Sequence, residues 1–82
     1  DWVAMCERGE DPASPAAQDL AARHVAWLAS VPGVPGQGKG ADFARYVRGL
    51  AEMYVADERF AVNYGGVTGA KFVRDALHAY LG

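Results

Sequence analysis

The chain has 82 residues, 51% of them hydrophobic, and a formal net charge of −2. A chain of this length forms one domain and buries only about 60% of the surface that its unfolded state exposes, so we expect a groove and not a deep enzyme-like cavity. Because phosphate binding needs several cations on one face, the absence of a Lys/Arg cluster excludes a nucleic-acid surface within this domain.

The composition also excludes several kinds of site and location. No apolar run approaches the roughly eighteen residues that a membrane-spanning helix needs, and no secretory leader begins the chain, so we expect a cytoplasmic protein without membrane contact. Cys6 is the only cysteine and there are two histidines, too few for a disulfide or a structural zinc site. We therefore expect no metal and no cofactor, with Cys6 as a small apolar residue that is buried or half-buried.

Two helices are predicted in the first part of the chain. Residues 1–8 have the apolar spacing of the last turns of a helix, and Gly9 is suited to a left-handed C-terminal cap. This helix has no start signal, so we expect the natural chain to continue upstream. Ser14 and Pro15 are a typical N-cap and first helical residue, and Pro32 ends the helix that they begin. The apolar stripe of this second helix consists of Leu20, His24, Trp27, Leu28 and Val31.

The second part predicts a loop, a long helix, a corner and a last helix. Glycines and prolines over residues 31–40 indicate a mobile loop. The long helix begins near Ala41, and Asp57 can cap a separate short segment after it. Gly65-Gly66 breaks the chain again, and Thr68 is expected to cap the last helix. The apolar face of that helix consists of Phe72, Val73, Ala76, Leu77, Tyr80 and Leu81. No segment alternates with a two-residue period, so the prediction is an all-α bundle of about five helices.

Two motifs suggest chemistry that their context does not support. Residues 33–40 match the first seven positions of a phosphate-binding loop, but Gly40 stands where a magnesium-binding Ser or Thr is required, and no strand precedes the loop. His24 lies on an apolar stripe, and His78 lies on a polar face where we expect it to be solvated. No nucleophile, base and orienting group can be combined from these residues, so we predict a protein that is not an enzyme.

The aromatic side chains allow two interpretations. They can form the core of a small helical domain, as such stripes usually do. Tyrosine and tryptophan also combine a flat apolar body with one polar tip, which suits a cleft for a large, partly polar organic molecule. The residues concerned are Trp27, Phe43, Tyr46, Tyr54, Phe60, Tyr64, Phe72 and Tyr80.

One stretch resembles a known family. The run Gly-Leu-Ala-Glu-Met-Tyr-Val-Ala-Asp-Glu-Arg-Phe at residues 49–60, followed by Asn63-Tyr64 and by residues 69–77, is similar to the TipAS antibiotic-recognition domain. Residues 4–15 and 20–27 also fit that family, so the similarity covers nearly the whole chain except the glycine loop.

The resemblance implies a globin-like all-α fold that binds large lipophilic antibiotics such as thiopeptides in a cleft between helices. It implies either the C-terminal effector part of a MerR-type transcription activator, with a DNA-binding domain upstream, or a free-standing sequestering protein. Members that trap thiopeptides covalently use cysteines, and the corresponding positions here are Asp42 and Gly49. Because only a thiolate can add to a dehydroalanine, we expect reversible binding. The N-terminal part of the family domain is missing, so we expect residues 1–82 to be one domain from a longer chain.

Two hypotheses remain open at this point. The first is a ligand-sensing domain whose groove is lined by His24, Trp27, Phe43, Tyr46, Val47, Leu50, Tyr54 and Phe72. The second is an interaction module whose apolar groove docks a helix, either from its own upstream chain or from a partner protein.

Overall fold

Five α-helices and two short 3₁₀ helices form the described part of the chain, residues 2–82, in this computed structural model. They are α1 (Trp2–Glu7), α2 (Pro15–Ala29), η1 (Pro35–Gly38), α3 (Gly40–Ala56), α4 (Glu58–Ala61), η2 (Val62–Tyr64) and α5 (Val67–Leu81). No strand occurs among these residues, which confirms the predicted all-α class. None of the described helices combines the length and apolar character needed to cross a membrane.

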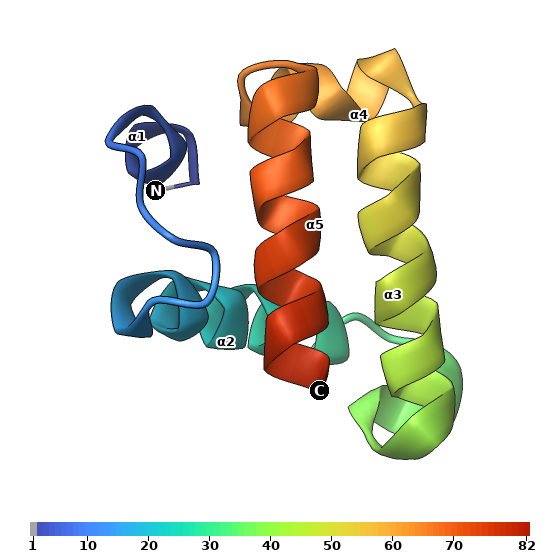
Figure 1. Ribbon diagram of the computed structural model, residues 1–82. Coiled ribbons are helices and arrows are strands. Elements are labelled where there is room, and N and C mark those ends of the chain that lie inside the picture. Colours follow the sequence, from blue (N-terminus) through green and yellow to red (C-terminus); the bar gives the residue numbers. More distant parts are fainter. Residues whose placement is uncertain (1) are drawn as a thin grey trace.

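Helix α5 is the central element of the bundle. Figure 1 shows α3 and α5 side by side, α2 crossing near the C-terminal end of α5, and α1 on the side of α5 away from α3. The short α4 and η2 segments connect α3 to α5. The largest fully buried side chains are Val47 on α3 and Val73 and Leu77 on α5, the two helices that share the most extensive contact.

Most of the predicted helix boundaries are confirmed by their capping contacts. The Ser14 hydroxyl accepts the Ala17 N–H at 3.2 Å, and Gly9 adopts a φ of 71° just after α1. Asp57 caps α4 by accepting the Arg59 N–H at 2.9 Å, and its carboxylate also pairs with the Arg59 guanidinium at 2.9 Å. These hydrogen bonds hold the pKa of Asp57 below its ordinary value.

The predicted cap of the last helix is wrong. Helix α5 begins at Val67 with Gly66 as its N-cap, and Thr68 lies within the first turn. Gly65 and Gly66 both have positive φ, 83° and 98°, so the chain reverses over these two residues. The Ala70 N–H then reaches the Gly66 carbonyl at 3.0 Å, which starts the helix two residues before the predicted cap could act.

The predicted buried face of α2 needs correction as well. Its buried residues are Ala17, Ala21 and Leu28, whereas Trp27 is 62% exposed. The helix ends at Ala29, so Val31, which is 41% exposed, lies outside it and not on its apolar face as predicted. The two alanines have small side chains, which let α2 lie close against α5, and this rotates the buried face away from Trp27. A tryptophan on the predicted apolar stripe is therefore left at the surface.

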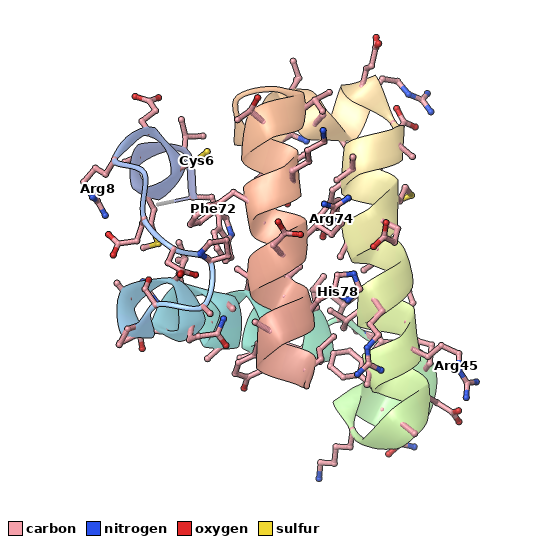
Figure 2. The ribbon with its side chains drawn as sticks, viewed as in Figure 1. Cys6, Arg8, Arg45, Phe72, Arg74 and His78 are labelled. Carbon is pink, nitrogen blue, oxygen red and sulfur yellow. The ribbon has the colours of Figure 1, made fainter. Side chains whose placement is uncertain are left out.

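His78 is not simply solvated, as the sequence suggested. Its Nε2 lies 2.7 Å from Oε2 of Glu52, so a polar contact links α5 to α3. Figure 2 shows His78 on the side of α5 that faces α3.

In the loop after α2, η1 contains two left-handed residues, Gly36 and Gln37, with φ of 63° and 55°.

Candidate functional site

Aromatic rings from five elements gather around the imidazole of His24. We call this group the His24 cluster, and its members are His24 and Trp27 of α2, Trp2 of α1, Tyr54 of α3, Phe60 of α4 and Tyr64 of η2. The ring centroids of Trp2, Trp27 and Tyr54 each lie 6.0 Å from that of His24, all edge-on. Tyr64 lies 6.4 Å from His24 and 5.1 Å from Tyr54, and Phe60 lies 6.2 Å from Tyr54.

Local sequence signals bring these rings together. His24 and Trp27 are three residues apart on α2, so they share one helix face. Tyr54 lies in the last turn of α3, and the Asp57 cap then redirects the chain so that Phe60 and Tyr64 return alongside Tyr54. A side chain on Gly69 would overlap the Tyr64 carbonyl oxygen, so the close approach of η2 to α5 depends on this glycine.

The polar atoms of the cluster are hydrogen-bonded to each other. The Trp2 indole Nε1–H donates to Nδ1 of His24 at 3.4 Å, and Nε2 of His24 lies 3.3 Å from the Tyr54 hydroxyl. Burial lowers the pKa of His24, so the imidazole is neutral at pH 7. Burial also raises the pKa of Tyr54, with the adjacent Tyr64 raising it further. Burial likewise raises the pKa of Tyr64. The site is therefore uncharged.

Exposure is graded across the cluster. Tyr54 is 5% exposed and Trp2 is 9% exposed, whereas Phe60 is 37% and Trp27 is 62% exposed. No charged side chain is buried among the described residues. The arrangement thus offers apolar ring faces at the surface, backed by a neutral set of hydroxyl, indole and imidazole groups. Such a surface suits a large uncharged molecule with aromatic or heteroaromatic rings.

The other predicted site residues are not members of this cluster. Phe43 and Val47 are buried with Leu28 in a second apolar group, and Tyr46 and Leu50 pack against it. Leu50 also packs against the main core, so it lies between the two groups. Phe72 is 8% exposed on the side of α5 facing α1 (Figure 2), and it meets the cluster through Trp2 at 6.1 Å.

Three cluster members were absent from the site predicted from the sequence. Phe60 and Tyr64 were recognised only as part of the aromatic supply, because their position depends on how α4 turns back after α3. Trp2 stands on the short α1, where the only sequence signal is its i, i+3 spacing to Met5, which is also buried. Contacts between residues this far apart in sequence cannot be obtained from periodicity alone.

Two hollows lie on the surface of the described residues, and only the smaller one is lined by a member of the cluster, Tyr64. A depression of about 430 Å³ is lined by Ala29, Ser30, Val31, Pro32, Gly33, Val34 and Gln37. A smaller pocket of about 210 Å³ is lined by Val3, Cys6, Glu7, Tyr64, Gly65, Thr68 and Gly69. Cys6 is a half-buried free thiol, as predicted. No group of acidic, histidine and cysteine side chains among residues 2–82 is suited to a metal ion.

Comparison with known proteins gives one match. The family model for the TipAS antibiotic-recognition domain matches residues 1–80 of the chain. No curated protein and no solved structure matches it significantly. The match covers α1 to α5 and all members of the His24 cluster. The chain therefore belongs to the TipAS family of antibiotic-recognition domains.

Proposed function

We propose that this domain binds a large lipophilic antibiotic-like molecule, a thiopeptide or a compound of similar character, at the His24 cluster. The observation that carries the proposal is the exposure of Trp27 and Phe60, which contact His24 and Tyr54 of an uncharged, hydrogen-bonded group of rings. Exposed rings that belong to one aromatic cluster form an apolar patch, and an exposed apolar patch with polar groups beside it is typical of a binding surface.

The remaining predicted residues take a supporting role in this proposal. Phe43, Tyr46, Val47 and Leu50 form the wall of the bundle next to the cluster, and Leu50 joins the two. A ligand larger than the cluster would extend along α3 toward Tyr46, which is half-buried. Phe72 supports Trp2 from behind and is too buried for direct contact with a ligand.

Binding is reversible in this account. Asp42 and Gly49, which align with the cysteines of covalently binding members, carry no thiol. The single cysteine, Cys6, lies on α1 with its sulfur 3.9 Å from the Thr68 carbonyl, in the smaller pocket and outside the ring contacts of the cluster. Among the cluster residues only Tyr64 shares that pocket with Cys6, so we expect a thiopeptide held over Trp27 and Phe60 to keep its dehydroalanines away from this thiol.

The domain serves either as the effector part of a MerR-type transcription regulator or as a drug-sequestering protein. Neither setting requires this domain to touch DNA, which agrees with its net charge of −2. The two settings differ in whether a winged helix-turn-helix precedes the domain in the same polypeptide. The sequence encoded upstream of Asp1 decides between them.

A binding screen with two matched variants tests the proposed function. Thermal shift and tryptophan fluorescence are measured with thiopeptides and other hydrophobic antibiotics. A compound that binds wild type should bind Trp27→Ala about thirtyfold more weakly, the loss typical of an aromatic hot spot. Tyr80→Ala removes an aromatic ring of 43% exposure outside the cluster and should bind normally. Equal losses in both variants, or no response to any compound, would contradict the proposal.

A further inference from the structure

Trp2 has a hydrogen-bonding role that its burial alone does not explain. An indole N–H can only donate, so the Nδ1 atom of His24 that receives it must carry a lone pair and no proton. A neutral imidazole carries one proton, which is therefore on Nε2. The Nε2–H then donates to the Tyr54 hydroxyl oxygen, 3.3 Å away.

The hydrogen-bond direction set at Trp2 continues to the hydroxyl of Tyr54. With its oxygen accepting from His24, Tyr54 must send its own hydroxyl hydrogen to another acceptor. Tyr64 packs against Tyr54 at 5.1 Å between ring centroids, and Phe60 at 6.2 Å, so Tyr54 lies among the rings of the proposed binding surface. The Tyr54 O–H is therefore the donor that this hydrogen-bond direction leaves to the site.

We propose that Trp2 is a positioning residue which, through the tautomer of His24, makes the site present a hydroxyl donor to its ligand. The site therefore selects neutral molecules that offer a hydrogen-bond acceptor, such as an amide carbonyl or an azole nitrogen, over isosteres that lack one. The part of this inference that concerns ligand selection rests on the proposed function. The tautomer of His24 is a property of the free protein and can be measured without any ligand.

The first experiment measures that tautomer in the full chain. Long-range ¹H–¹⁵N NMR at pH 7.5 should show an unprotonated Nδ1 and a protonated Nε2 for His24, with His78 identified through the variant His78→Gln. Trp2→Phe removes the indole donor and keeps an aromatic ring, so Nδ1–H should become populated. Trp27→Phe is the matched control, because Trp27 touches the same imidazole at 6.0 Å without a hydrogen bond, and it should leave the tautomer unchanged.

The second experiment measures ligand selection with two isosteres. Benzothiazole carries an acceptor nitrogen that benzothiophene lacks, and their binding is compared by ligand-observed NMR. Wild type should favour benzothiazole by about threefold to tenfold, the worth of one hydrogen bond. In Trp2→Phe, checked for folding by circular dichroism, the preference should fall toward one.

The outcomes separate this inference from the proposed function. A protonated Nδ1 in wild type would overturn the role of Trp2 even if Trp2→Phe failed to fold. Equal binding of both isosteres to wild type would overturn the donor assignment. If neither isostere binds although the tautomer is as stated, the failure lies with the proposed site.

Discussion

Replacing Gly69 by alanine should disrupt both the stability of the domain and the His24 cluster. Gly69 lies in the first helical turns of α5, and an added Cβ would overlap the carbonyl oxygen of Tyr64 and approach its backbone carbon. The obstacle is backbone and not the end of a flexible side chain, so the η2 segment must shift. Forcing extra volume into a packed site usually costs 1–3 kcal/mol, and we expect about 3 kcal/mol here.

The matched control is Gly49→Ala on α3. Gly49 is helical and exposed, and a Cβ added there meets nothing within 4 Å. This substitution should therefore stabilise the domain by roughly 0.5–1 kcal/mol, the difference in helix propensity between glycine and alanine. The same glycine-to-alanine substitution should thus lower the free energy of unfolding at position 69 and raise it at position 49.

Thermal and urea unfolding of the two variants check this prediction. Gly69→Ala should lower the Tm by on the order of 15 °C relative to wild type, since 1 kcal/mol shifts a domain of this size by about 4–8 °C. It should also weaken ligand binding, because Tyr64 moves with η2. If Gly69→Ala is as stable as Gly49→Ala, the close contact between α5 and η2 is refuted.

Three further predictions follow from single contacts. Ser14→Ala removes the hydroxyl that caps α2 at 3.2 Å and should cost about 1 kcal/mol in urea unfolding, whereas Ser30→Ala at the other end of α2 should cost less. Burial lowers the pKa of His24 from its ordinary value of 6.5, so below pH 6.5 the unfolded state binds more protons than the folded state. The contribution of neutral His24 to stability should be complete above pH 6.5 and be lost as the pH falls through the folded pKa. The same acid loss of stability in His24→Gln would refute this assignment. Intact mass spectrometry after incubation with a binding thiopeptide should show the unmodified mass, and an adduct on Cys6 would contradict reversible binding.

The sequence predicted the elements well because their signals are local. The Ser14 and Asp57 caps and the break at Gly65-Gly66 each depend on a few neighbouring residues, and each lies where it was expected. The prediction failed at Thr68, where the start of α5 was set by two consecutive glycines with positive φ and not by side-chain capping. A capping residue therefore indicates a helix start only when the residues before it have not already begun the helix.

The candidate site was harder to derive from the sequence because it depends on how helices meet. The apolar stripe of α2 correctly included His24, but the alanines that pack against α5 turned Trp27 outward. Trp2 contacts His24 across 22 residues of sequence, and no periodicity within α1 indicates that contact. Residues that touch across separate elements become visible only when the bundle is assembled.

The central claim is that a lipophilic antibiotic binds at the His24 cluster, and NMR titration tests it most directly. A thiopeptide that responds in the screen is added to ¹⁵N-labelled protein while the indole, imidazole and aromatic ring signals are followed. We predict the largest shifts at Trp27, His24, Phe60 and Tyr64, with little change at Tyr80. Shifts concentrated at the depression lined by residues 29–37, or no shifts at saturating ligand, would contradict the account.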